Sequence, residues 1–181
     1  MGGYKMRNII SILFIVFANA LFSQETPAQD IGLTQLTLEQ KLDRSVMNSV
    51  SYLSMGLSFA KSMGKTAEEY GEYCAGLAIP AYQFLIGRSP IEVINVIYGV
   101  QQTDKNFEIQ IDESSGSSLT GRMSLFGLSY IRLSDGFGGV TEADFYTFYN
   151  TFFKKFVESV GFAYEYEVKE DWIVFTINKN D

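Results

Sequence analysis

Residues 141–160 predict a helix with one almost entirely aromatic face, and no other segment limits the fold as strongly. Thr141 is a suitable N-cap, and Glu142 and Asp144 would complement the helix dipole in the first turn. At about 100° per residue, six aromatic side chains fall within an arc of roughly 140°. They are Phe145, Phe148, Tyr149, Phe152, Phe153 and Phe156, and the opposite side carries Thr147, Thr151, Lys154 and Glu158. Such an apolar face requires a sheet or other helices to cover it.

Two predicted β-hairpins flank this helix. Residues 107–112 alternate apolar and polar side chains, and residues 119–125 continue the alternation after a turn rich in serine and glycine. Gly121 is a candidate position for a β-bulge. After the helix, residues 162–168 and 172–177 form the second predicted hairpin. The last strand is apolar on both faces, which is typical of a strand that is central or covered.

Three helices are predicted before the first strand, each from a clear start signal. The signals are Thr37 with Gln40, Thr66 with Glu69, and Ser89-Pro90-Ile91-Glu92. The first helix would run to Gly64, with Leu42, Val46, Leu53, Leu57 and Ala60 at helical spacing. The glycine-rich residues 126–140 are expected to form a plain connection, and a mobile loop beside a pocket is the alternative.

This order of elements predicts an α+β domain: N-terminal helices, then a β-hairpin, an amphipathic helix and a second β-hairpin. The four strands would form an antiparallel sheet covered by helices. We expect a single domain over residues 37–181, preceded by a flexible leader at residues 24–36.

The first 23 residues have the pattern of a signal peptide. Lys5 and Arg7 precede a short apolar run, and small residues follow, with cleavage after either Ala20 or Ser23. A membrane anchor is the alternative, but the apolar run is shorter than the roughly twenty residues that span hydrocarbon. No cysteine follows the apolar run, which argues against a lipid anchor. We therefore expect an exported protein, either periplasmic or secreted.

The composition excludes several classes of site. The chain has no histidine, so it lacks the usual base of serine and cysteine hydrolases and the usual ligand of zinc and haem. Cys74 is the only cysteine, so an intrachain disulfide is impossible. The net charge of −7 would become −9 on loss of the two N-terminal cations, and this acidity argues against nucleic acids and anionic membranes as partners.

Helices followed by hairpin, helix and hairpin over residues 37–178 resemble the ligand-binding superfamily of haem nitric-oxide-binding and four-vinyl-reductase-type domains. The resemblance is one of topology and apolar pattern. It implies an apolar cavity between the sheet and the helices. Haem ligation does not carry over, because the haem members use a histidine that this chain lacks, and the cysteines that reductase-type members often carry are absent around Tyr166–Phe175. No cofactor is expected.

The leading hypothesis is an exported, non-enzymatic domain that binds a small apolar or amphipathic ligand between the aromatic helix and the sheet. The candidate ligand-binding residues are Met123, Phe148, Phe152, Phe156, Tyr164 and Tyr166. The same residues would equally suit a filled core.

Two alternatives stay open. One is a structural or protein-interaction domain without a small-molecule site. The other is a carboxylate-dependent hydrolase using Glu165 with Glu167, or Glu68 with Glu69, although a solvated face and helix capping also explain these acids.

Overall fold

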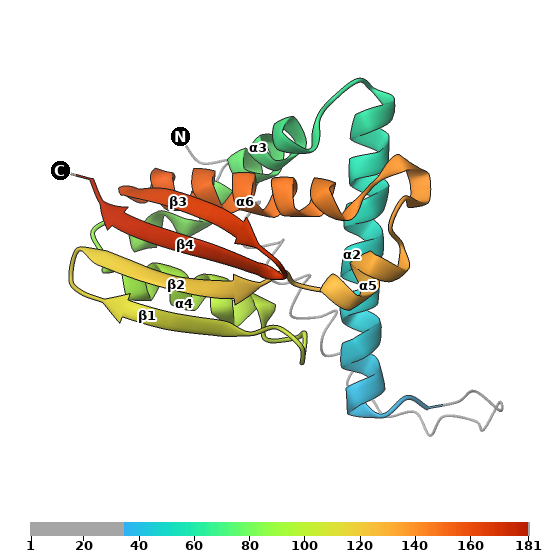
Figure 1. The fold of residues 1–181 in the computed structure, drawn as a ribbon, viewed down its shortest axis with the longest axis horizontal. Helices are drawn as coiled ribbons and strands as arrows, with labels where there is room; N and C mark the ends of the chain where they lie inside the picture. The colour runs from blue at the N-terminus through green and yellow to red at the C-terminus, as the bar shows by residue number, and fades with distance from the viewer. Residues whose placement is uncertain (1–34, 181) are drawn as a thin grey trace, which may run out of the picture. The chain divides into compact units, whose positions relative to one another are not determined.

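The computed structural model describes residues 35–180 (Figure 1). The helices and strands are α2 (Leu38–Ser62), α3 (Ala67–Ala78), the 3₁₀ helix η1 (Ile79–Leu85), α4 (Pro90–Gln101), β1 (Ile109–Ser114), β2 (Ser118–Ser124), α5 (Leu128–Leu133), η2 (Phe137–Gly139), α6 (Glu142–Ser159), β3 (Phe162–Lys169) and β4 (Trp172–Lys179). This order confirms the predicted α+β class. The predicted signal peptide and most of the predicted leader lie outside the described residues.

The four strands form one antiparallel sheet in the order β1-β2-β4-β3. The two hairpins are joined by the pairing of β2 with β4, in which Gly121 lies opposite Phe175. The last strand is therefore central, as its apolar character predicted. Helices α4 and α6 lie behind the sheet in Figure 1, and α3 packs on the outer side of α6.

Helix starts follow the predicted capping signals. At α3, the Thr66 hydroxyl accepts from the Glu69 N–H at 3.1 Å, and the Glu69 carboxylate accepts from the Thr66 N–H at 2.9 Å. At α4, the Ser89 N–H and hydroxyl both donate to Glu92. Reciprocal pairs of the same kind begin α2 (Thr37 with Gln40) and α6 (Thr141 with Asp144). Each pair satisfies backbone donors that have no partner inside the helix.

The bulge expected at Gly121 lies in the partner strand. The register between β1 and β2 shifts between Ile111 and Glu113, and Gly121 pairs with Ile111 beside that shift. A Cβ atom at Gly121 would collide with the carbonyl oxygen of Gln110 and lie 3.2 Å from the ring of Phe175. Glycine is required here because the backbone of the neighbouring strand occupies the space of a side chain.

Helix α6 is buried on more than its aromatic face. Thr151 was expected on the solvent side, but it is buried, since α3 covers that side of the helix. Gly71 permits the close approach: a Cβ atom there would lie 2.9 Å from the carbonyl oxygen of Phe148 and 3.1 Å from the Cβ of Thr151. The sequence pattern identified one partner for α6, whereas the fold supplies two.

Two other segments differ from the sequence-based expectation. Residues 126–140 are more than a plain connection, because they contain α5 and η2 and contribute the fully buried Ile131 to the core. Six residues are too few for helical periodicity to stand out in the sequence. In β1, Ile111 was expected on the buried face but is exposed, since β1 is an edge strand and the register shift follows directly after this residue.

Helix α2 buries one face and exposes a second apolar one. Its buried side chains are Val46, Val50, Ser54, Leu57 and Ala60, while Leu42 is exposed rather than buried. An exposed stripe, which we call the α2 stripe, consists of Tyr52, Met55, Phe59 and Met63. These four positions lie within an arc of about 80° on the helix. Within the described residues, no helix combines the length and apolar character needed to cross a membrane.

Candidate ligand-binding cavity

An aromatic-lined cavity of about 310 Å³ lies between α6 and α4. Its lining consists of Ser49, Tyr82, Val96, Ile97, Val100, Gln101, Thr103, Phe126, Phe148, Tyr149, Phe152, Phe153 and Phe156. The volume is at the lower end of the range for small-molecule sites, which are mostly apolar with a few polar groups. We call this space the α4–α6 cavity.

Helix α6 supplies one wall through positions four residues apart. Phe148, Phe152 and Phe156 follow the i, i+4 spacing that places side chains on one face of a helix. The rings of Phe148 and Phe152 are stacked with centroids 6.2 Å apart. Phe148 and Phe156 are buried, and Phe152 is half-buried. At one end of the cavity, the rings of Tyr82 of η1 and Phe156 pack edge to face, with their centroids 4.9 Å apart.

Helix α4 supplies the opposite wall with Val96, Ile97, Val100 and Gln101. Ile97 is buried in the core, whereas Val100 is 59% exposed and forms part of the rim. Gln101 is only 7% exposed. No hydrogen bond joins its side-chain amide to any group within residues 35–180. The α4 wall is therefore apolar except at its last residue.

A buried carboxylate lies next to the polar end of the cavity. Asp104 accepts hydrogen bonds from the backbone N–H groups of Gly127 at 2.7 Å and Asn106 at 2.9 Å. Burial, and secondly the charge of Asp104, raise the pKa of Tyr149 well above its ordinary value. The side chains that line the cavity carry no formal charge among the described residues.

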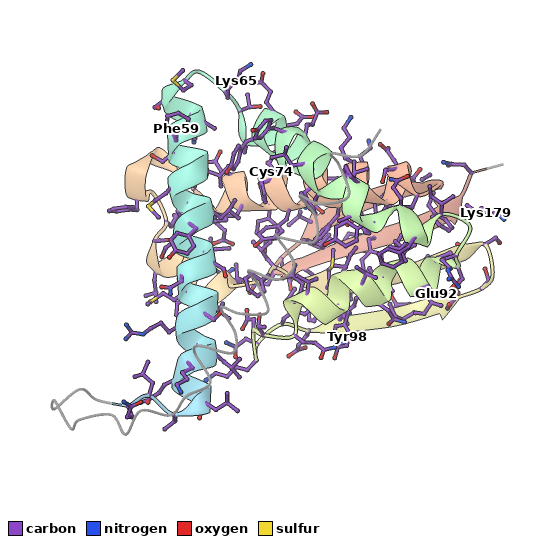
Figure 2. All side chains as sticks on the ribbon, turned by 180° about the vertical axis from the view of Figure 1, so that it is seen from behind. Phe59, Lys65, Cys74, Glu92, Tyr98 and Lys179 are labelled. Atoms are coloured by element: carbon purple, nitrogen blue, oxygen red, sulfur yellow. The ribbon has the colours of Figure 1, made fainter. Side chains whose placement is uncertain are left out.

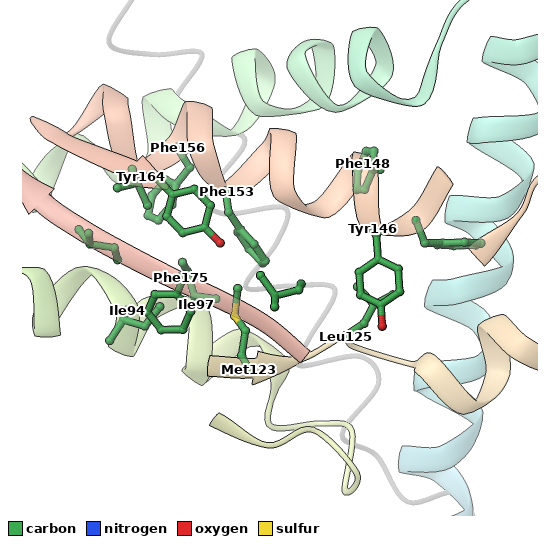
Figure 3. Close-up of a cluster of buried hydrophobic side chains, with 14 of the residues drawn as sticks. Ile94, Ile97, Met123, Leu125, Tyr146, Phe148, Phe153, Phe156, Tyr164 and Phe175 are labelled. Carbon is green, nitrogen blue, oxygen red and sulfur yellow. The ribbon is translucent and has the colours of Figure 1, made fainter. Parts of the chain in front are cut away.

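The structure brings three of the six predicted ligand-binding residues together. Phe148, Phe152 and Phe156 line the α4–α6 cavity. Met123 and Tyr164 are buried on the sheet side of the hydrophobic core, where the Tyr164 and Phe175 rings stack with centroids 6.4 Å apart (Figure 3). Tyr166 lies farther along β3 and is 43% exposed.

Sequence reasoning placed the cavity between the aromatic helix and the sheet, and it missed the α4 wall. The space between α6 and the sheet holds side chains such as Phe153, Met123 and Phe175 (Figure 3). The signal that could have found the other wall is the i, i+4 pair Val96 and Val100. Gln101 follows that pair but gives no sign of its burial in the sequence.

The carboxylates considered for catalysis have other surroundings. Glu69 caps α3 and pairs with Lys65 at 2.7 Å, while Glu165 and Glu167 are exposed on β3. Burial raises the pKa of Cys74, which makes its thiol less reactive. Across the described residues, no group of three or more Asp, Glu or Cys side chains is arranged to hold a metal ion.

Comparison with known proteins gives a resemblance of topology. No family model matches the chain, and no curated protein matches it. The Fe(II) unliganded H-NOX protein from K. algicida is similar at a TM-score of 0.40 and 18% identity, over 64% of this chain and 62% of that one. A mutant of the same protein gives a TM-score of 0.39 and 16% identity, over 87% and 80%. Both are weak, topology-level resemblances at low identity, of the kind expected from the sequence.

Proposed function

We propose that this domain binds a small apolar or amphipathic molecule in the α4–α6 cavity, as an exported, non-enzymatic protein. The observation that carries the proposal is an aromatic-lined space of about 310 Å³ that is partly open to solvent at Val100. Apolar surface gains about 25 cal/mol for each Å² removed from water, so a ligand that covers these rings would be held by the hydrophobic effect. The uncharged lining supports an apolar guest over an ionic one.

Filling the cavity tests this function. Val96→Trp places a large ring in the space, and Val168→Trp makes the same change at a half-exposed position on β3, outside the cavity. We expect the first variant to bind an environment-sensitive apolar dye at least about tenfold more weakly, a loss of about 1.4 kcal/mol. The control should bind the dye like the wild type, and both variants should stay folded.

Two results would contradict the proposal. One is a folded wild-type protein that binds no apolar dye. The other is a Val96→Trp variant whose thermal stability and dye affinity both match those of the wild type.

A second candidate function, protein interaction, is favoured by the α2 stripe. Phe59, which Figure 2 labels near the end of α2, is 67% exposed, and Phe137 of η2 lies across a hollow of about 440 Å³ lined mainly by serines and these aromatic rings. A fully exposed side chain of this size offers about 200 Å². At their exposed fractions, the four residues of the α2 stripe and Phe137 together expose roughly 600 Å² per molecule. Two copies would bury about 1,200 Å², the lower limit of a specific interface. The α2 stripe lies beside this hollow, and a second copy of this chain offers the same two features. A second copy is therefore the simplest partner for this surface.

Sedimentation equilibrium tests that second candidate. Phe59→Ser should weaken a dimer of the wild-type protein at least tenfold, whereas Phe84→Ser, at an equally exposed ring on η1, should leave it unchanged. A wild-type protein that stays monomeric at about 100 μM would rule out this interaction. A Kd of about 100 μM corresponds to a binding free energy of roughly −5.5 kcal/mol.

A further inference from the structure

We infer that the ligand of the α4–α6 cavity is amphipathic, with one uncharged hydrogen-bonding group, and that Gln101 is the residue that recognises this group. The inference rests on the proposed function, since it concerns the same cavity. It goes further by separating three classes of ligand: purely apolar molecules, ionic amphiphiles and neutral amphiphiles.

The Gln101 amide faces the cavity without a protein partner among the described residues. This side chain is 7% exposed and lines the cavity, yet no group within residues 35–180 is hydrogen-bonded to its amide. Among the described residues, the side-chain atoms that are sealed from water without a partner are Tyr146 Oη, Asn150 Oδ1 and Tyr164 Oη, so the Gln101 amide keeps its access to water within the cavity. A ligand group that replaces this water has to offer a hydrogen bond in its place, or the amide is left unpaired. A carboxamide can both donate and accept a hydrogen bond. A ligand with a hydroxyl or amide group at this point would satisfy it.

The polar side chains are unevenly distributed along the cavity. Gln101 ends α4, and Thr103 follows two residues later, so these two polar side chains come from the same end of the cavity. The far end is formed by the edge-to-face pair of Tyr82 and Phe156. Figure 2 shows the direction of α4, with Glu92 at its far end and Tyr98 closer to α2. Apart from the tyrosine hydroxyls and Ser49 of α2, whose hydroxyl donates to the Ser45 carbonyl, the cavity therefore has an amide-bearing end and an aromatic end, which is the complement of an amphiphile.

The charges around the cavity favour an uncharged polar group on the ligand. Asp104 is buried close to Thr103, and its carboxylate is held by two backbone N–H groups rather than by a cation. Its negative charge, together with burial, also raises the pKa of Tyr149 in the cavity wall. A second anion here would be repelled by Asp104 and would find no cation in the lining. A cationic group would be attracted by the same charge, but Asp104 does not line the cavity and its carboxylate already accepts two backbone N–H groups, so the cation would lose its water without a direct partner.

Displacement of an apolar dye by three probes of equal chain length tests the inference on the wild-type protein. The probes are 1-octanol, octanoate and octylammonium at pH 8. We expect octanol to displace the dye at a concentration at least about tenfold lower than either ion, because one hydrogen bond and the avoided charge burial each contribute on this scale. This selectivity is measured without any substitution, so it does not depend on the folding of a variant.

Two glutamine variants then locate the recognition. Gln101→Leu should weaken octanol binding about tenfold relative to the apolar dye, since the hydrogen bond to octanol is lost while the added apolar surface keeps or strengthens dye binding. Gln102→Leu is the matched control, because this neighbouring glutamine is exposed and does not line the cavity. It should behave like the wild type with every probe.

The possible results test the proposed function and the polar group of the ligand separately. If neither the dye nor octanol binds the folded protein, the proposed function fails. If the dye binds but octanoate competes as well as octanol, or Gln101→Leu leaves octanol binding unchanged, the inference about the ligand's polar group is overturned and the apolar site stands.

Discussion

Neighbouring residues on one aromatic helix have different roles. Both Phe152 and Phe153 line the α4–α6 cavity, but Phe153 is buried in the hydrophobic core, whereas Phe152 is half-buried. Their rings lie 5.9 Å apart in an edge-to-face arrangement. The aromatic arc thus continues from buried core to the half-exposed cavity wall, and burial, rather than residue type, separates the two residues.

Alanine substitutions should separate these roles. We expect Phe153→Ala to lower the free energy of unfolding by about 3 to 5 kcal/mol, the usual cost of a cavity at a buried phenylalanine. Phe152→Ala should cost about 1 to 2 kcal/mol, because its ring is only half-buried and loses less contact on truncation, and it should weaken dye binding. Urea denaturation of both variants measures the difference. Equal losses in the free energy of unfolding would mean that the cavity is closed around Phe152.

At the level of elements, the β1–β2 pair depends on one glycine. Gly121→Ala would drive a Cβ atom into the Gln110 carbonyl, which belongs to the backbone of the paired strand and has little freedom to move. We expect a loss of more than about 2 kcal/mol in the free energy of unfolding, as for other overpacked positions. Gly99→Ala is the control, since nothing lies within 4 Å of a Cβ atom there in α4. Thermal denaturation should show this second variant to be stabilised by about 0.5 to 1 kcal/mol.

Local signals predicted the elements, and non-local contacts determined the site. The cap of Thr141 and the spacing of Phe148, Phe152 and Phe156 define α6 and one of its faces within a few turns of chain. Local sequence patterns could not identify what lies opposite that face. Gln101 comes from α4, about fifty residues earlier, and its burial follows from how the two helices pack. Periodicity gives the direction of a side chain and leaves open whether the space in front of it is filled.

At the scale of the whole molecule, the N-terminal pattern concerns location. Cleavage after Ala20 or Ser23 would remove both early cations and leave a protein with a net charge of −9. We expect the intact mass of the protein recovered outside the producing cell's cytoplasm to lack at least Met1–Ala20. A mass that includes those residues would contradict export with cleavage and favour retention of the segment.

The pH dependence of stability is also a property of the whole chain. With no histidine, the chain has no side chain that ordinarily titrates near pH 6.5, and burial moves the pKa of Cys74 upward, away from neutrality. We therefore expect the free energy of unfolding to vary by less than about 1 kcal/mol between pH 6 and 9.

Stability should then fall on both sides of that plateau. Lys65 holds the pKa of Glu69 below its ordinary value, and Arg132 does the same for Asp171, so their contributions are present above about pH 4 and are lost as the pH falls through the folded-state pKa. Burial raises the pKa of Tyr164 above the ordinary value of about 10. Its contribution is present below about pH 10 and is lost at higher pH, as the unfolded chain ionises first. Thermal denaturation from pH 3 to 11 measures the profile, and a transition between pH 6 and 8 would contradict it.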